Sequence, residues 1–208
     1  MNLLIITIIV SSSLYIYFDI TKKRVLKYVL KPLTTILVII LALQQSPEGI
    51  DLYGLTILFG LGFSLIGDVY LMLPTNKFIQ GLAAFFIAHI FYIVAFSSGF
   101  GPFLDFEYLI PVAIYAIIFL WVLLPKTGKM KLPVIIYTFV LMIFMWQATG
   151  MYYYMAQTSA FYVFIGAIFF VISDTILAYA KFITNFRLSS MFIHSTYWGA
   201  QILIALSI

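Results

Sequence analysis

Long apolar segments alternate with short polar ones along the whole chain. Each apolar segment has about the 17 to 25 residues that an α-helix needs to cross the hydrocarbon core of a bilayer. The pattern therefore predicts an all-α membrane protein with eight transmembrane helices. Their expected bounds are Met1–Phe18, Tyr28–Leu43, Leu52–Leu73, Phe78–Ser97, Tyr108–Leu124, Leu132–Tyr152, Ser159–Ala180 and Leu188–Ser207.

The basic residues are confined to alternate loops. All 11 lysines and arginines lie in or beside the segments that follow the first, third, fifth and seventh apolar runs. The segments after the second and fourth runs carry Glu48, Asp51, Asp105 and Glu107 instead. Because cytoplasmic loops are enriched in Lys and Arg, we expect the odd-numbered loops to face the cytoplasm. Both termini are then expected on the non-cytoplasmic side.

The composition supports a membrane location. Hydrophobic residues make up 64% of the chain and charged residues 9%, against about 45–50% and about 25% in soluble domains. This excludes a soluble fold and predicts one transmembrane domain over residues 1–208, in the bacterial inner (cytoplasmic) membrane. The net charge of +4 comes from the basic loops, so no nucleic-acid partner is expected. The absence of cysteine excludes disulfides, thiolate metal sites and a cysteine nucleophile.

The two halves of the chain carry similar polar positions. Asp68 and His89 lie in the third and fourth apolar runs, and Asp174 and His194 lie at nearly the same spacing in the seventh and eighth. This favours two parallel four-helix repeats, about residues 1–100 and 101–208, related by a pseudo-two-fold axis along the membrane normal. The alternative is a chance match between short apolar segments. In the repeat, the two Asp side chains meet near the axis in the cytoplasmic half of the bilayer.

Ionisable side chains inside apolar helices are costly. An Asp at the centre of a transmembrane helix costs about 2.5 to 3.5 kcal/mol on insertion, and such residues normally face the bundle interior or a wet cavity. Other polar positions recur near the two acids at helical spacing. We expect them to line one cavity that opens toward the cytoplasmic leaflet and binds a substrate. These positions are Ser64, His89, Tyr92, His194, Tyr197 and Gln201.

Two carboxyls in one buried site favour acid–base hydrolysis. Two like charges close together disfavour each other, so one carboxyl stays neutral as an acid while the other remains charged. Glycosidases use this division to pass through an oxocarbenium-like transition state. The alternative is a structural role, in which each Asp is hydrogen-bonded and holds helices together.

The polar residues are also compatible with two other functions. The two Asp and two His could hold a divalent cation, but their spacing matches no metal motif and we expect no metal. Lys31, which with Pro32 opens the second helix, is a candidate for binding a lipid phosphate. Topology determination by the basic loop explains this lysine equally well.

Short motifs follow one another along the chain. They are Lys31–Thr35 (KPLTT), Gly67–Leu71 (GDVYL), Gly81–Phe85 (GLAAF), His89–Tyr92 (HIFY), Ser173–Asp174 and Tyr197–Gln201 (YWGAQ). In this order they resemble the YhhN family, which includes the bacterial and animal lysoplasmalogenases. The resemblance implies an eight-helix integral membrane hydrolase without a cofactor. It also implies that Asp68 and Asp174 are the catalytic pair, surrounded by Lys31, His89, Tyr92, Tyr197 and Gln201.

The reaction implied by the resemblance is hydrolysis of the vinyl ether bond of a lysoplasmalogen to a fatty aldehyde and a glycerophospho-alcohol. Protonation of the vinyl β-carbon starts the cleavage, and a carboxylate stabilises the oxocarbenium ion that results. The implied partner is a lysophospholipid in the lipid bilayer, and the sequence sets no oligomeric state. The alternatives are a proton-coupled transporter that uses the acids as a relay and a non-catalytic lipid-binding membrane protein.

Overall fold

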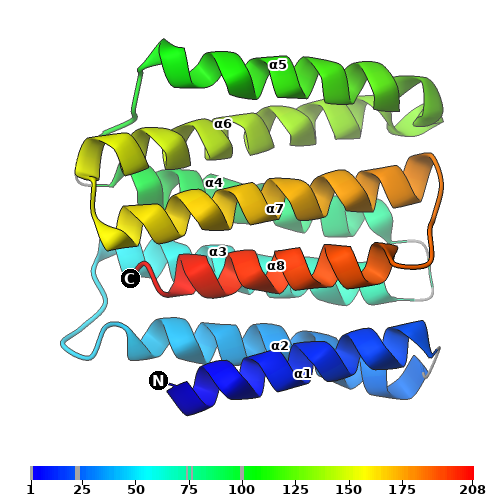
Figure 1. Cartoon of the computed structure of the whole chain (residues 1–208), viewed down its shortest axis with the longest axis horizontal. Helices are drawn as coiled ribbons and strands as arrows, with labels where there is room; N and C mark the ends of the chain where they lie inside the picture. The colour runs from blue at the N-terminus through cyan, green and yellow to red at the C-terminus, as the bar shows by residue number, and fades with distance from the viewer. Residues whose placement is uncertain (1, 22–23, 74, 76, 99–100) are drawn as a thin grey trace.

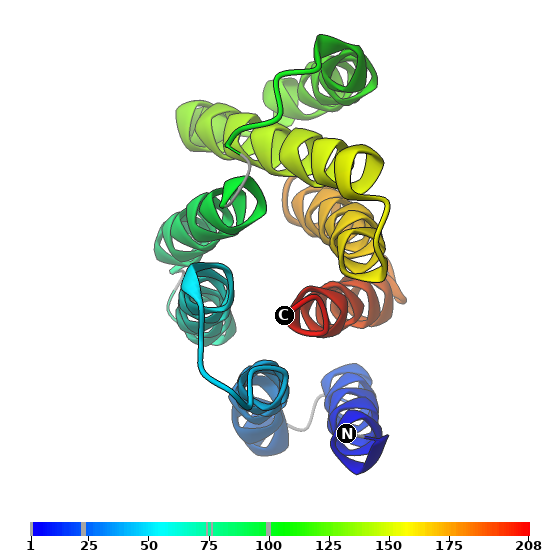
Figure 2. The same ribbon diagram turned by 90° about the vertical axis from the view of Figure 1, so that its left-hand side faces the viewer.

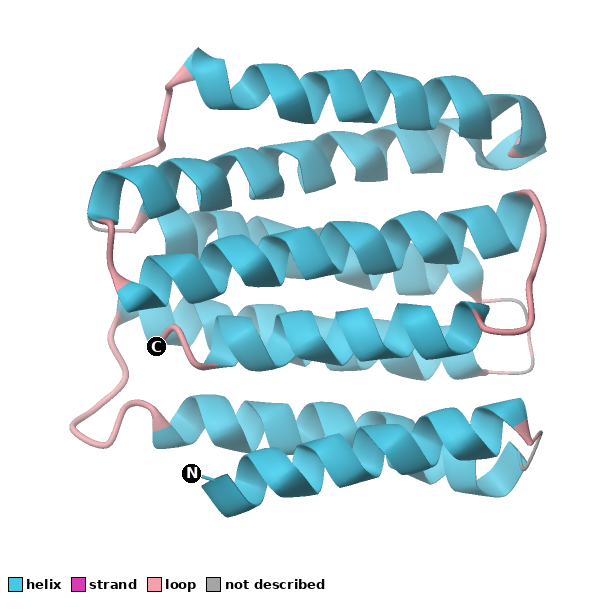
Figure 3. Cartoon of the chain, in the orientation of Figure 1, coloured by secondary structure: helices cyan, strands magenta, loops and turns pink. Residues whose placement is uncertain are grey.

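The computed structural model describes residues 2–21, 24–73, 75, 77–98 and 101–208. These residues form eight α-helices joined by loops and short 3-10 turns, and they contain no strand (Figure 3). The predicted number of helices is confirmed, and the predicted bounds agree closely except at the start of the second helix. The helices are α1 (Asn2–Ile20), α2 (Arg24–Gln44), α3 (Leu52–Met72), α4 (Phe78–Ser97), α5 (Phe106–Leu123), α6 (Lys131–Met155), α7 (Thr158–Phe182) and α8 (Ser189–Ala205).

Most of the helices close into a ring around the bundle axis. In the end view, α2, α3 and α4 form one side of the ring, α1, α8 and α7 form the other, and α6 joins the two sides (Figure 2). α5 lies outside the ring against α6. Helices far apart in sequence therefore become neighbours, because α8 contacts α1, α2 and α3.

The helix lengths identify a multi-pass membrane protein. Among the described residues, seven helices, α1 to α7, are long and apolar enough to cross a membrane. α8 has 17 residues, which is near the lower limit for a span, and it packs along α7. Both termini lie at one end of the bundle, and the C-terminal ends of α1, α3, α5 and α7 lie at the other (Figure 1). The cytoplasmic orientation of that second end and the four-helix repeat stay predictions.

α2 begins earlier than expected. It starts at Arg24 instead of Tyr28, so Lys31 and Pro32 lie two turns inside the helix, and the expectation that they open it is wrong. Pro32 has no N–H, so the Tyr28 carbonyl four residues earlier lacks its usual helical donor. The helix nevertheless continues through this turn, where Thr34 Oγ1 donates to the Leu30 carbonyl at 2.7 Å. Lys22 and Lys23 of the basic loop lie outside the described residues.

Two glycines of α3 allow α3 and α4 to pack in close contact near Asp68. A Cβ on Gly67 would lie 2.6 Å from the ring of Phe85, and a Cβ on Gly60 would lie 2.3 Å from the ring of Tyr92. Both distances are shorter than any ordinary carbon contact. The rings of Phe85 and Tyr92 on α4 can therefore pack directly against the backbone of α3. This packing fixes how deep Asp68, the residue after Gly67, lies within the bundle.

Candidate functional site

A polar cavity opens at the end of the bundle where α1, α3 and α7 end. It has a volume of about 400 Å³, and α1, α2, α3, α4, α7 and α8 contribute to its wall. Asp68 of α3 and Asp174 of α7 both line it. The structure therefore brings the two acids that the sequence singled out to one cavity, together with Lys31, His194 and Tyr197.

Asp68 is held by three neighbours from two other helices. Lys31 Nζ of α2 lies 3.2 Å from Asp68 Oδ1. The hydroxyls of Thr35 and Tyr197 donate to Asp68 Oδ2 at 2.7 and 2.8 Å. Asp68 is only 1% exposed, and charge-assisted contacts of this kind offset the cost of burying a carboxylate.

Thr35 is itself positioned by a further residue of α8. Trp198 Nε1 donates to Thr35 Oγ1 at 3.3 Å, and this indole ring is almost fully buried. The hydroxyl of Thr35 thus accepts one hydrogen bond and donates another, so its orientation is fixed. The motif residues of α2 and α8 consequently meet around the α3 carboxylate.

Asp174 lies in different surroundings. Tyr137 of α6 donates a hydrogen bond from its hydroxyl to Asp174 Oδ2 at 2.5 Å. Asp174 also lines a small hollow of about 40 Å³, whose other lining residues, Leu177 among them, are mostly apolar. The Asp174 side chain therefore borders both the polar cavity and a mostly apolar space.

A third acid in the cavity was missed by the sequence reasoning. Asp19 of α1 lines the same cavity, and its carboxylate accepts hydrogen bonds from Lys27 at 2.9 Å and Ser190 at 2.5 Å. His194 lies beside it, with its Nδ1 atom 2.8 Å from the carbonyl of Ser190 and its ring 4.6 Å from that of Tyr15. Asp19 stands where the first apolar run ends, a position that is typical of an interfacial residue.

Several of the expected cavity residues lie behind the cavity wall instead. Ser64, His89, Tyr92 and Gln201 are buried but do not line the polar cavity, so the expectation that they line it is wrong. Tyr92 donates from its hydroxyl to Gln201 Oε1 at 2.8 Å, and Ser64 Oγ lies 3.3 Å from the same hydroxyl. These contacts join α3, α4 and α8 in the bundle core.

His89 is enclosed by aromatic rings. Its Nδ1 atom lies 2.7 Å from the Phe85 carbonyl, and the rings of Phe144 and Phe170 lie 4.7 and 4.6 Å from its own. Helical periodicity predicted the face of α4 on which His89 lies, but it did not predict which helix covers that face.

Within the part of the chain that the structure describes, no three His, Asp or Glu side chains are grouped closely enough to hold a metal ion.

The mouth of the cavity carries two lysines, of which Lys27 is paired with Asp19. Lys27 and Lys181 line it from α2 and α7, and Asn185 and Ser189 add polar groups from the α7–α8 connection and the start of α8. The ammonium group of Lys181 lies 4.9 Å from the ring centre of Phe78. Positive charge at the mouth and carboxyls inside make the cavity suitable for a ligand with an anionic head and a reactive group deeper down.

Comparisons with known proteins place the chain in a family. The sequence profile of the YhhN family matches residues 26–208. The uncharacterized membrane protein YhhN of Escherichia coli O157:H7 is 25% identical over 184 residues, which cover 88% of this chain and 86% of the relative. No solved structure matches the chain.

Two human relatives carry the name lysoplasmalogenase. TMEM86B is 34% identical over 145 residues, covering 69% of this chain and 59% of the relative. TMEM86A is 31% identical over 158 residues, covering 73% and 64%. The aligned segments span less than two thirds of both human proteins. Because the family profile extends over most of the chain, from α2 to the end of the sequence, this multi-pass membrane protein belongs to the YhhN family.

Proposed function

We propose that the chain is an intramembrane hydrolase that cleaves the vinyl ether bond of lyso vinyl-ether phospholipids, with Asp68 and Asp174 as its acid–base pair. The observation that carries the proposal is one cavity with two carboxyls in unlike surroundings. The names of the human relatives support the same reaction class.

The two acids take different roles. Asp68 is the charged partner, because the Lys31 ammonium and two hydroxyl donors compensate a carboxylate there. Asp174 is the proton donor, because its carboxyl borders the apolar hollow and so can reach the hydrocarbon side of an ether bond. Tyr137 orients this acid through its hydrogen bond.

The reaction adds one water to the lipid. Asp174 gives its proton to the vinyl β-carbon, and the electrons of the double bond form the new C–H bond. The α-carbon becomes part of an oxocarbenium ion, which the negative charge of the Asp68 carboxylate stabilises. Water attacks this carbon, and a proton from the water restores Asp174. The bond from this carbon to the glycerol oxygen of the hemiacetal then breaks while the hydroxyl proton of the hemiacetal passes to the glycerol oxygen, which gives the fatty aldehyde and the free alcohol.

The test is aldehyde release by the purified protein in lipid nanodiscs. A lyso vinyl-ether phosphatidylethanolamine serves as the substrate, and the aldehyde is trapped by reduction and measured by mass spectrometry. In deuterated water we expect one deuterium on the carbon next to the aldehyde group, because the first step places a solvent-derived proton on carbon. The saturated alkyl-ether analogue has no double bond to protonate and should not react.

Substitutions distinguish aldehyde release by this protein from aldehyde release by a contaminating enzyme. Asp68→Asn and Asp174→Asn should each abolish aldehyde release, whereas Asp105→Asn should not, because Asp105 is exposed and lies outside the cavity. Full activity in either cavity variant would refute the acid–base pair. Vesicle uptake of intact lipid without any cleavage would favour a transporter, and binding that survives loss of both acids without turnover would favour a non-catalytic lipid-binding protein.

A further inference from the structure

Two apolar hollows lie one after the other beside the polar cavity. The first is the small hollow beside Asp174, which shares Phe85 and Leu177 with the polar cavity. The second has a volume of about 380 Å³ and shares Phe119, Thr138 and Leu141 with the first. The three spaces are therefore neighbours, and the smallest of them lies between the polar one and the long apolar one.

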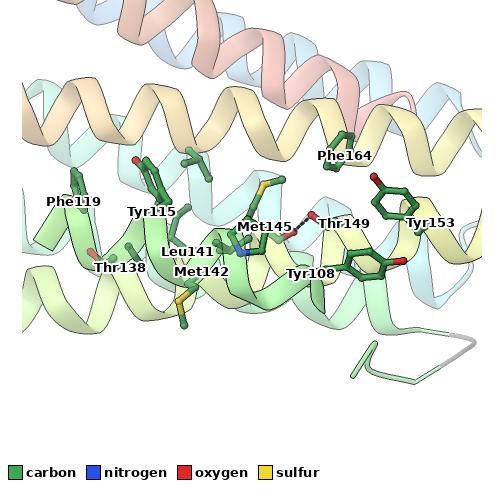
Figure 4. A pocket seen from close by; sticks show the side chains of 14 residues that line it. Tyr108, Tyr115, Phe119, Thr138, Leu141, Met142, Met145, Thr149, Tyr153 and Phe164 are labelled. Atoms are coloured by element: carbon green, nitrogen blue, oxygen red, sulfur yellow. Dashed lines mark hydrogen bonds between the residues drawn. The ribbon is translucent and has the colours of Figure 1, made fainter. Parts of the chain in front are cut away.

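The second hollow is an elongated groove between α5, α6 and α7, called the tail groove below. Figure 4 shows its side chains in a row, from Phe119 and Thr138 at one end to Tyr108 and Tyr153 at the other. The rings of Tyr108 and Tyr153 are stacked with their centres 4.7 Å apart, and they form the far end of the groove. From Thr138 to the level of Thr149, α6 rises by about 16 Å at about 1.5 Å per residue.

The dimensions and chemistry of the tail groove suit one hydrocarbon chain. One leaflet supplies about half of the roughly 30 Å hydrocarbon core of a bilayer, so a single lipid tail has a length similar to that of the groove. The threonine hydroxyls in the wall are already bonded within α6, Thr138 to the Val134 carbonyl and Thr149 to the Met145 carbonyl, each at 2.8 Å. The Tyr115 hydroxyl in the wall is bonded to Thr175 of α7, and most of the other lining side chains are apolar, so the groove accepts an apolar occupant.

Asp174 lines both the polar cavity and the small hollow that lies next to the tail groove. In a vinyl-ether lipid the reactive double bond joins the glycerol oxygen to the first carbons of the tail. A lipid whose head lies at the mouth of the polar cavity and whose tail lies in the tail groove therefore brings this bond to Asp174. α5, which closes the tail groove, lies at the edge of the bundle and exposes much of its surface to lipid (Figure 2).

We infer that the tail groove binds the single hydrocarbon tail of the lipid substrate and sets an upper limit on its length, an inference that rests on the hydrolase function proposed above. One groove accepts one tail, which agrees with the single-tailed substrate of the proposed function. The stacked pair Tyr108 and Tyr153 sets the limit. A tail that reaches past this pair must fold back or leave the groove.

Substitutions that shorten the tail groove test the inference. Thr149→Phe fills its far part, and Ala116→Phe fills a position nearer to Asp174. Ile117→Phe is the matched control, because Ile117 is the next residue of α5, is 67% exposed and does not line the groove. Vinyl-ether lipids with short and long tails compete in the same nanodiscs, and the ratio of the two aldehydes is measured.

We expect Thr149→Phe to lower the ratio of long-tail to short-tail product by about ten-fold or more, since misfit of a methylene in an apolar pocket discriminates by at least about this factor. Ala116→Phe should move the limit to still shorter tails, and Ile117→Phe should leave the ratio unchanged. An unchanged ratio in an active Thr149→Phe protein would overturn the inference, as would an equal change in Ile117→Phe.

A labelling experiment on the unmodified chain does not depend on turnover or on the folding of variants. The probe is an alkyl lysophospholipid with a photoreactive diazirine at the end of its tail. We expect labelling at Tyr108, Met145 and Tyr153 that an excess of the same lipid without the diazirine reduces. Labelling confined to the exposed Ile110 or Ile117 of α5 would overturn the assignment of the tail groove. Labelling in the groove without cleavage of any vinyl ether would refute the hydrolase and leave the tail site standing.

Discussion

Lys31 and Asp68 form a buried ion pair, and removing its cation tests whether the pair holds the site together. Lys31→Met keeps a side chain of similar shape and removes the charge. Asp68 is 1% exposed, so its carboxylate cannot turn to water when the ammonium is lost. Breaking a buried pair in this way typically costs about 3 to 5 kcal/mol.

The loss of unfolding free energy expected in Lys31→Met has an upper limit. A carboxyl with an ordinary solution pKa of about 3.9 can be protonated at about pH 7 at a cost of roughly 4 kcal/mol. Asp68 would take up a proton before the penalty exceeded this value. Two hydroxyl donors remain in place and offset part of the charge. We therefore expect Lys31→Met to lower the free energy of unfolding by about 3 to 4 kcal/mol.

The assay is equilibrium unfolding in mixed detergent micelles with increasing dodecyl sulfate. A double-mutant cycle with Asp68→Asn isolates the coupling between the two side chains. The double variant should recover most of the loss, because two neutral groups replace the two charges. Lys129→Met is the control, since Lys129 is exposed and lies outside the cavity wall. Wild-type stability in Lys31→Met, or simple addition of the two single losses, would refute the reasoning.

Three further outcomes are expected. Tyr137→Phe removes the hydroxyl that orients the Asp174 carboxyl and should slow aldehyde release by about ten- to hundred-fold, while the unfolding free energy changes by only about 1 kcal/mol. A loss of activity that is fully accounted for by a loss of folded protein would contradict a positioning role. Gly67→Ala places a methyl group against an α4 ring and should destabilise the protein by about 1 to 3 kcal/mol in the same micelle assay, whereas Gly62→Ala, with open space around it, should have no such effect. Lys181→Gln at the cavity mouth should raise KM for anionic lipids by about two- to five-fold and make KM less sensitive to salt, as is typical of an exposed charge, and Lys129→Gln should not.

The helices and the two central acids could be predicted because the bilayer limits both strictly. A spanning helix must be apolar over about 20 residues, so the length of each run reveals it. An Asp inside such a run is costly enough to require partners. Asp68 and Asp174 therefore stood out in the sequence, and the structure places both at one cavity. Whether they catalyse a reaction stays a prediction.

The neighbours of the acids were harder to predict, because periodicity gives a helix face but not the helix that covers it. His89 and Gln201 share faces with cavity residues, yet other helices bury them in the core. Asp19 lies at the end of an apolar run, where a charge is ordinary. Only the packing of α1 and α2 against α8 reveals that it belongs to the cavity.

The partners of Asp68 become available at different times during synthesis. Lys31 and Thr35 belong to α2 and are made before Asp68, so they can reach its carboxylate as soon as α3 enters the membrane. Tyr197 belongs to α8 and arrives last. A chain that has not yet received its final helix therefore contains an incompletely held carboxylate, and the site can become functional only after the whole bundle has been inserted.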